Sequence, residues 1–426
     1  MARVLAYTSP ARGHLFPLTP ILDELRDRGH EISLRTLASQ LDLMQARGFD
    51  AAPIDPAIEQ IDHDDYLART PLGAEKRAVR VFCQRAEHDA RDLRRAIDDV
   101  HPDALMVDVN AWGALAVAEA WGGPWASWCP YPLPLPSRDA PPFGPGFRPA
   151  RGRAGRLRDA ALRPVMFGSL ERIVTPRINE VRERVGVRPL RGAADLFLAP
   201  PLLIYQSAEP FEYPRSDWPA SVRLVGPCDW DPPAEAPRWL EQVEEPIVLV
   251  TTSSEFQDDD RLVRLALEAL ADEQLQVVAT FPSGDPASVN APPNARVLSF
   301  VPHGPILDRA ACAITHGGMG ATQKALARGV PVCVVPFGRD QFEVARRVEV
   351  AEAGTRLPAK RLSAKRLRAA VREAIRRREG AGRVADGYRR AGGAGAAADA
   401  FEELLSSRDT GHSRPEAGRR SRSART

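Results

Sequence analysis

Residues 311–320, which read ACAITHGGMG, join a short apolar run to a glycine-rich turn. The run at 311–315 predicts a buried strand, and residues 319–328 predict an amphipathic helix that precedes a second apolar run at 331–335. This order suits a phosphate group, because glycines let the backbone approach closely and the first amides of the helix point at the anion. His316, inside the turn, adds a hydrogen-bond donor or a positive charge. The competing interpretation is a turn whose glycines serve only packing.

Several short motifs surround this turn in a fixed order. They are Phe300-Val301-Pro302, His316-Gly317-Gly318-Met319-Gly320, Ala325-Leu326-Ala327-Arg328-Gly329-Val330-Pro331, and Pro336 followed by Asp340-Gln341. Together they resemble the donor-binding signature of family 1 glycosyltransferases, GT-B enzymes that transfer sugars from UDP- or dTDP-sugars to small molecules. A lone Gly-x-Gly is a weak signal, whereas several motifs in order are specific. The resemblance implies an α/β fold with two Rossmann-like domains that face each other across a cleft.

The same resemblance implies which residues bind the donor. Those for the pyrimidine are Phe300 and Val301, those for the pyrophosphate are His316, Gly318, Met319 and Gly320, and those for the sugar hydroxyls are Asp340 and Gln341. A carboxylate and an amide bind hydroxyls through several hydrogen bonds, although Asp340 also fits a plain helix start. Ser253 and Ser254 follow the strand predicted at 246–251 and offer hydroxyls to phosphate or ribose. The family usually has Gly-Ser or Gly-Thr there, so this assignment is a loose one.

Two positions depart from the family pattern. Lys324 stands where relatives commonly place a glutamate that chelates the ribose diol, and Ala321 stands where threonine or serine is usual. The departure at position 324 puts ribose recognition in doubt. It also favours dTDP over UDP, because deoxyribose lacks one hydroxyl.

Two polar residues in the N-terminal part follow predicted strands. Apolar runs at 3–8 and 103–108 predict parallel strands, so His14 and Asp108 lie at the carboxyl edge where open α/β sheets bind ligands. An imidazole there accepts a proton from an alcohol near neutral pH, and a carboxylate fixes its tautomer. The resemblance, through the motif Gly13-His14-x-x-Pro17, makes His14 the catalytic base and Asp108 its partner. The competing interpretations are a capping or solvent-facing histidine and a helix N-cap aspartate.

Aromatic side chains in the N-terminal half are candidate acceptor contacts. Residues 129–155 are rich in proline, glycine and aromatics and predict an irregular loop, which in the resembling fold overhangs the acceptor site. The candidate residues are Phe82, Trp112, Tyr131, Phe143 and Phe147. The acidic loop at 62–65 has the residue types of a metal site. We expect a solvated turn there, because the resembling family is metal-independent.

Length and composition fit two globular domains. A chain of 426 residues exceeds one ordinary core, and a net charge of +2 with 44% hydrophobic residues gives no indication of nucleic-acid binding. No apolar run is long enough to span a bilayer and the start lacks a signal-peptide pattern, so we expect a cytoplasmic protein without stable membrane association. The five scattered cysteines predict reduced thiols and no zinc site.

The expected domain boundaries follow changes in composition. An acceptor-binding domain at residues 1–207 has a first helix that begins at Pro17 and a last strand at 202–206. The segments after it are a proline-rich linker at 208–238, a nucleotide-sugar-binding domain at 239–385, a helix at 386–405 that packs back on the first domain, and a disordered tail at 406–426.

The resemblance implies an inverting, metal-independent O-glycosyltransferase without a cofactor. It would move a hexose from a UDP- or dTDP-sugar to a hydroxyl of a lipophilic small molecule, such as a polyketide, macrolide, ansamycin or aromatic natural product. The role would be antibiotic biosynthesis or inactivation, with these two small molecules as partners and a monomer or homodimer as the active form. Two alternatives stay open: a nucleotide-sugar 2-epimerase, and a non-catalytic sugar-nucleotide-binding protein, which would not need His14 and Asp108.

Overall fold

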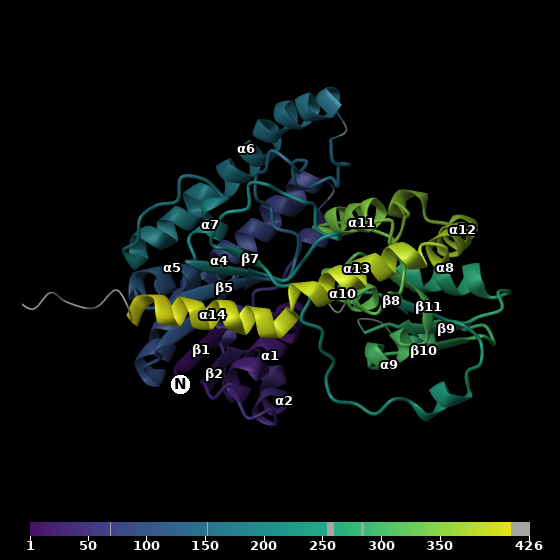
Figure 1. The fold of residues 1–426 in the computed structure, drawn as a ribbon, viewed down its shortest axis with the longest axis horizontal. Coiled ribbons are helices and arrows are strands. Elements are labelled where there is room, and N and C mark those ends of the chain that lie inside the picture. The colour runs from purple at the N-terminus through teal and green to yellow at the C-terminus, as the bar shows by residue number, and fades with distance from the viewer. Residues whose placement is uncertain (69, 151, 254–259, 283–284, 410–426) are drawn as a thin grey trace, which may run out of the picture.

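Two parallel β-sheets, each with helices on both faces, form the protein (Figure 1). The computed structural model describes residues 1–68, 70–150, 152–253, 260–282 and 285–409. The first sheet has seven strands in the order β3-β2-β1-β4-β5-β6-β7, and the second has six in the order β10-β9-β8-β11-β12-β13. The strand order reverses beside β1 and beside β8, which confirms the predicted α/β class with two Rossmann-like halves.

The described elements of the first half are β1 (Arg3–Tyr7), α1 (Arg12–Asp27), β2 (Glu31–Thr36), α2 (Leu41–Gln45), β3 (Asp50–Pro53), α3 (Pro56–Glu59), α4 (Pro71–Val100), β4 (Ala104–Asp108), α5 (Trp112–Trp121), β5 (Trp125–Cys129), α6 (Gly152–Val185), α7 (Asp195–Leu198), β6 (Leu202–Tyr205) and β7 (Val222–Leu224). Those of the second half are β8 (Ile247–Thr251), α8 (Asp260–Leu270), β9 (Gln276–Thr280), β10 (Ala295–Leu298), α9 (His303–Leu307), β11 (Ala310–Thr315), α10 (Met319–Ala327), β12 (Val332–Val334), α11 (Gln341–Val350), β13 (Gly354–Arg356), α12 (Ala364–Ile375) and α13 (Arg378–Ala391). The last helix, α14 (Gly393–Asp409), returns to the first half.

The central strands are apolar throughout because helices cover both faces of each sheet. Successive side chains of a strand point to opposite faces. In β1, Val4 therefore packs into one core and Leu5 into the other. In β8, Ile247 and Val248 divide in the same way. The continuous apolar runs seen in the sequence are typical of parallel sheets buried on both sides.

The first helix begins earlier than predicted. Helix α1 starts at Arg12, so His14 lies in its first turn rather than in a loop, and Pro17 lies inside the helix. Its N-cap residue, Ala11, makes no side-chain capping hydrogen bond. Because alanine carries no capping signal, the sequence marks this helix only by its proline, and the predicted start was too late.

The segment predicted as a linker at 208–238 divides between two roles. Its residues Val222–Leu224 form β7, which pairs with β6 and is the edge strand of the first sheet. The prediction that the strand at 202–206 is the last of the first half was therefore wrong. A three-residue strand with one buried side chain has no readable alternation. The chain crosses to the second sheet after β7, between residues 225 and 246.

The boundary predicted at residues 385 and 386 lies inside α13. That helix packs against α10 of the second half and ends at Gly392, which has a φ of +88°. Helix α14 then runs back along α1 (Figure 1) and buries Phe401 in a core of the first sheet. It starts at Gly393 and continues to Asp409, into the segment predicted as a disordered tail. Residues 410–426 lie outside the described residues.

Candidate active site

His14 and Asp108 meet at the carboxyl edge of the first sheet. Helix α1 presents His14 from its first turn, and β4 ends at Asp108. Nδ1 of His14 lies 2.9 Å from Oδ1 of Asp108, and both residues are buried. Asp108 is not the N-cap of α5, because Ala111 holds that position. An imidazole oriented in this way by a carboxylate uses Nε2 as its proton-accepting nitrogen.

Asp108 is held as a carboxylate. Burial by itself raises the pKa of a carboxyl group, but the charge and hydrogen bond of His14 and the backbone N–H groups of Asn110 and Ser9 outweigh it, so the pKa of Asp108 is lowered. The N–H and the hydroxyl of Ser9 donate to Oδ2 over 2.9 and 2.7 Å, and the Asn110 N–H donates to Oδ1 over 2.8 Å. Because an ionised carboxylate only accepts hydrogen bonds, Nδ1 of His14 carries the proton.

Asn110 completes this edge and was not among the predicted site residues. Its Nδ2 atom lies 3.2 Å from Nε2 of His14, and its Oδ1 atom accepts a hydrogen bond of 2.8 Å from the hydroxyl of Tyr131. The ring centroids of His14 and Tyr131 are 5.7 Å apart. The signal that could have revealed Asn110 is its place just after Asp108, at the carboxyl end of the same strand. Ser9, which follows β1, carries the same signal.

The glycine-rich turn lies at the carboxyl edge of the second sheet, between β11 and α10. Gly317 has a φ of +97°, and a Cβ atom there would lie 2.9 Å from Cβ of Gln341. A Cβ atom on Gly318, the N-cap of α10, would lie 2.5 Å from Nε2 of His316. Only glycine fits both positions. Gly320 follows inside α10 with open space around it, so the first amides of this nine-residue helix are accessible to an anion.

His316 is a neutral imidazole rather than a cation. The residue is buried, and burial lowers its pKa to about 4 despite a backbone hydrogen bond at Thr251. At neutral pH one ring nitrogen then carries a proton and the other a lone pair. Of the two roles that the sequence allowed, donor or positive charge, burial excludes the positive charge.

The other predicted donor residues differ in exposure. Phe300 follows β10 with 58% of its surface exposed, whereas Val301 and Met319 are buried in the core that includes β8 and α10. Met319 therefore offers its backbone N–H rather than its side chain. Ser253 is buried just after β8, and Ser254 lies outside the described residues.

Asp340 and Gln341 stand at the start of α11. Asp340 is the N-cap, but its side chain makes no capping hydrogen bond, so the plain helix-start interpretation does not account for it. Burial raises the pKa of Asp340, and the charges of Arg339 and His14 oppose this. His14 is thus close enough for its charge to act on a residue of the other half. Oε1 of Gln341 accepts the N–H groups of residues 337 and 338 over 2.8 and 3.1 Å, which holds the loop before α11.

Lys324 is paired with the connecting segment, which is the stretch between residues 225 and 246 that joins the two halves. Its Nζ atom donates to the Trp230 carbonyl oxygen over 2.8 Å and forms ion pairs with Asp229 and Asp231. Asp231 also accepts a hydrogen bond of 2.9 Å from the N–H of Gly304, in α9. The lysine therefore fastens this connecting segment to α9 and α10. That pairing is the structural reason for a positive charge at this position.

Three of the five predicted acceptor residues lie in or against one hydrophobic core of the first half. Phe82 of α4 and Trp112 of α5 have ring centroids 5.1 Å apart, and Tyr131 packs against the same core. Phe143 and Phe147 are half-buried in the loop after β5. The guanidinium of Arg158 in α6 lies 5.5 Å from the ring centroid of Phe147, so the contact of this ring is with α6 and not with His14.

The loop between β5 and α6 docks on α11 of the second half. Glu343 accepts the N–H groups of Gly144 and Gly146 over 2.8 and 3.1 Å. Arg347, one turn further along α11, forms buried ion pairs with Glu343 and with Glu212, which lies between β6 and β7 of the first half. The irregular loop predicted at 129–155 is confirmed for residues 130–150, but its ends were wrong, because Cys129 belongs to β5 and α6 begins at Gly152. Their contacts join the acceptor side of the molecule to the helix that begins at Gln341.

The acidic loop at 62–65 is not a solvated turn. Asp65 is buried and accepts hydrogen bonds of 2.7 and 2.8 Å from the guanidinium of Arg339 in the second half. Asp64 forms ion pairs with Arg77 and Arg80 of α4. Asp65 and Arg339 are 274 positions apart in the sequence, so no local pattern could pair them.

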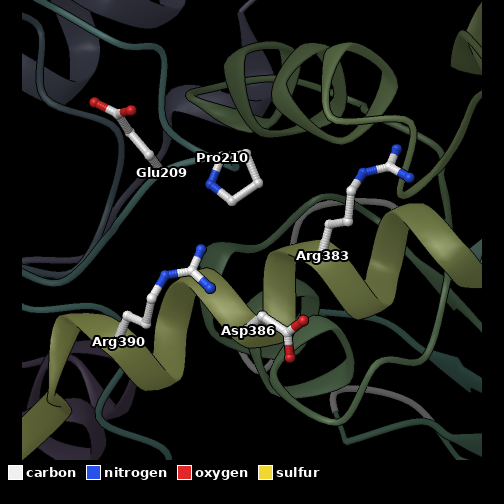
Figure 2. Close-up of a pocket in the computed structure, with 5 residues that line it drawn as sticks. All are labelled: Glu209, Pro210, Arg383, Asp386 and Arg390. Atoms are coloured by element: carbon white, nitrogen blue, oxygen red, sulfur yellow. The ribbon is translucent and has the colours of Figure 1, made fainter.

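A charged cavity of about 320 Å³ lies between α13 and the segment that joins β6 to β7 (Figure 2). Its lining residues are Glu209, Pro210, Arg383, Asp386 and Arg390. Figure 2 shows the last three projecting from one helix, α13, beside the Glu209–Pro210 segment. Because none of the predicted site residues lines it, this cavity is separate from the two edges.

Two further features of the structure concern metal-ligand sets and membrane-spanning helices. Across the part of the chain that the structure describes, no three His, Cys, Asp or Glu side chains come together as a metal-ligand set. Within the same residues, no helix has the length and apolar character needed to cross a membrane.

Comparisons with known proteins agree on one fold and one class of protein. Residues 264–390 match the family described as erythromycin biosynthesis protein CIII-like, C-terminal domain. The chain is 34% identical over 412 residues to 4'-demethylrebeccamycin synthase of Lentzea aerocolonigenes, which covers 91% of this chain and 96% of that protein. The solved structure of the glycotransferase of kitacinnamycin superposes with a TM-score of 0.71 at 25% identity, covering 95% of this chain and 100% of the other. Glycosyltransferase VinC in complex with DTDP superposes with a TM-score of 0.68 at 22% identity, covering 95% and 100%.

Proposed function

The chain belongs to the natural-product glycosyltransferases of the GT-B fold and is a hexosyltransferase. From this premise we propose that it is an inverting, metal-independent O-glycosyltransferase acting on a lipophilic small molecule, with dTDP-sugar preferred over UDP-sugar as the donor. The observation that carries the proposal is the 2.9 Å contact between Nδ1 of His14 and Oδ1 of Asp108, across from Asp340. Family membership argues against the epimerase and the non-catalytic binding protein.

His14 is the general base in this proposal. Its Nε2 atom removes the proton from an acceptor hydroxyl, while the carboxylate of Asp108 stabilises the imidazolium that forms. The acceptor oxygen forms a bond to the anomeric carbon as the bond from that carbon to the diphosphate breaks on the opposite face. Configuration at the anomeric carbon therefore inverts, and the nucleoside diphosphate leaves with the electron pair.

The carboxyl edge of the second sheet (the second edge) stabilises the leaving diphosphate. The first amides of α10 and the positive end of its dipole favour the charge that develops there, and the buried neutral imidazole of His316 lies beside them. Several fixed donors reduce the need for a divalent cation, which supports metal independence. Asp340 is the carboxylate for sugar hydroxyls, because its side chain is not used as a helix cap.

Two observations support dTDP over UDP. Lys324 is engaged with Asp229 and Asp231, so it supplies no acceptor for a ribose diol. The structural relative VinC was solved with DTDP. The relative named 4'-demethylrebeccamycin synthase supports an antibiotic-type acceptor, and the aromatic group around Phe82 and Trp112 suits an apolar one.

Turnover followed by mass spectrometry tests the proposal. The protein is incubated with dTDP-glucose or UDP-glucose and a panel of hydrophobic natural products. We expect a hexose adduct with the β configuration from an α-linked donor, unchanged by a chelator and lost in His14→Ala. The matched control is His101→Asn, because His101 is exposed at the end of α4, has a φ of 53° that asparagine tolerates, and precedes β4 at the opposite edge of the sheet. An adduct formed at full rate by His14→Ala would overturn the base assignment, and retained configuration would overturn inversion.

A further inference from the structure

We propose that Asn110, held by the hydroxyl of Tyr131, is a positioning residue that keeps Nε2 of His14 unprotonated in the free enzyme, and that the acceptor hydroxyl replaces its NH2 group at the lone pair of Nε2 when the substrate binds. The proposal rests on the function proposed above, in which His14 is the base. It assigns a role to a side chain that no sequence motif marks. It also gives the Tyr131 hydroxyl a task other than direct contact with the acceptor.

The hydrogen bonds among these side chains are compatible with one direction only. The ionised Asp108 can only accept, so His14 donates from Nδ1 and keeps a lone pair on Nε2. A lone pair there requires a donor opposite it, which is the NH2 group of Asn110 at 3.2 Å. Oδ1 of Asn110 then points away from the ring, to the place where the hydroxyl of Tyr131 donates over 2.8 Å.

Tyr131 is a reliable donor at the end of this chain. Burial raises the pKa of its hydroxyl well above the usual value, and the nearby Cys129 and Asp108 act in the same direction, so the hydroxyl keeps its proton. An amide whose oxygen is held by that proton does not turn its oxygen toward the imidazole. Such a turned oxygen would accept from a protonated Nε2 and would stabilise the wrong state of the base.

The backbone holds residue 110 independently of its side chain. The N–H of Asn110 donates to Oδ1 of Asp108 over 2.8 Å, and the N–H of Ala111 donates to the carbonyl oxygen of Asp108 over 3.0 Å. These bonds form the tight turn between β4 and α5, and a substitution at position 110 leaves both in place. A variant there therefore tests the amide group rather than the turn.

The carboxylates around His14 favour the protonated ring, and the hydrogen bond from Asn110 opposes them. The titratable groups near the imidazole include Asp108 at the end of β4, Asp340 at the start of α11 and Tyr131 in the loop after β5. Cys129, at the end of β5, donates to the Tyr131 carbonyl oxygen beside them. Both carboxylates favour the imidazolium. The donor on Asn110 favours the neutral ring, so removing it shifts the balance toward protonation.

The test is an NMR titration of the His14 imidazole in the full-length protein without substrate, together with the acidic limb of the pH profile of kcat/KM. In Asn110→Ala we expect both midpoints to move up by about half to one pH unit, which corresponds to one lost hydrogen bond. Asn110→Asp places a carboxylate beside Nε2 and should move them further. Tyr131→Phe should move them less, in the same direction, because the amide then turns.

The matched control is Tyr7→Phe, which removes another buried tyrosine hydroxyl, one that bonds to Asp92 over 2.9 Å rather than to Asn110 or His14. It should lower stability and leave both midpoints unchanged. A purely structural role for Asn110 would lower kcat and the melting temperature without moving the titration, and that result would overturn the proposal. If the imidazole midpoint moves as expected while His14→Ala keeps full turnover, the positioning stands and the base assignment fails.

Discussion

The carboxyl edge of the first sheet is formed mainly by side chains, and that of the second sheet mainly by backbone. At the first edge, side chains hold one another: Ser9 and His14 bind Asp108, and Asn110 joins His14 to Tyr131. At the second edge, two glycines and the first amides of α10 form a surface from backbone, with one buried neutral histidine behind it. The two edges differ because a proton transfer needs an oriented lone pair, whereas binding a diphosphate needs space and aligned N–H groups.

The largest effect that would sharpen this comparison is expected from Asp108→Asn. An amide nitrogen facing Nδ1 of His14 would force the proton to Nε2, so we expect kcat to fall by about 10³-fold. The affinity for dTDP, measured by calorimetry, should stay unchanged because the second edge is untouched. Ser9→Ala removes one of the bonds to the same carboxylate and should cost about tenfold. A parallel loss of dTDP affinity would mean that the two edges are not separable.

The second expectation concerns pH and stability at the second edge. The pKa of His316 is about 4 in the folded protein against an ordinary value of 6.5, so the unfolded chain binds more protons between these values. The contribution of His316 to the free energy of unfolding should therefore be constant above pH 6.5 and fall by about 3 kcal/mol as the pH drops to 4. Asp108, whose pKa is lowered, loses its stabilisation only at still lower pH.

Denaturant titrations at several pH values, run on the wild type and on His316→Gln, measure this window. The glutamine variant should reduce the slope of the curve between pH 6.5 and 4 without removing it, because burial lowers the pKa of His303 to about 4 as well. His101→Asn, which changes an exposed histidine, should leave the slope unchanged. An unchanged slope in His316→Gln would show that another group carries the proton uptake.

A change of backbone shape should affect the second edge alone. Gly317→Ala combines a left-handed φ of +97° with a Cβ atom 2.9 Å from Gln341, so we expect dTDP affinity to fall by about ten- to hundredfold. The imidazole of His14 should titrate as in the wild type. Gly382→Ala, where the added Cβ meets nothing within 4 Å, is the control and should bind dTDP normally. Normal binding by Gly317→Ala would contradict a turn that requires glycine.

The smallest effect is expected at Lys324, behind the second edge. Lys324→Glu would restore the family residue but place a third carboxylate beside Asp229 and Asp231. We expect a loss of about 1 kcal/mol in the free energy of unfolding and no gain in affinity for UDP over dTDP. Lys360→Glu, on the exposed surface, is the control. Tighter UDP binding by Lys324→Glu would show that this position still faces the ribose.

Much of the second edge could be predicted because its parts lie close together in the sequence. One stretch from Phe300 to Gln341 carries the strand, the turn, the helix and the loop, and glycine at 317 and 318 has a local reason. The meeting of His14 and Asp108 was also predictable, because residues that follow parallel strands share one edge of the sheet. The partner of Asp65 was not, since Arg339 is 274 positions away. Nor was β7, which is too short to show an alternating pattern.

The sequence by itself determined the two parallel sheets, the residues that stand at their carboxyl edges, and the need for glycine in one turn. Those properties depend on the order of apolar runs and on backbone geometry, which neighbouring residues fix. Only the tertiary structure decided that His316 is neutral, that Nδ1 of His14 carries the proton, that Asn110 faces Nε2, and that Lys324 fastens the connecting segment. Protonation and pairing depend on desolvation and on distances between groups that are remote in the chain, and these exist only once the chain is packed.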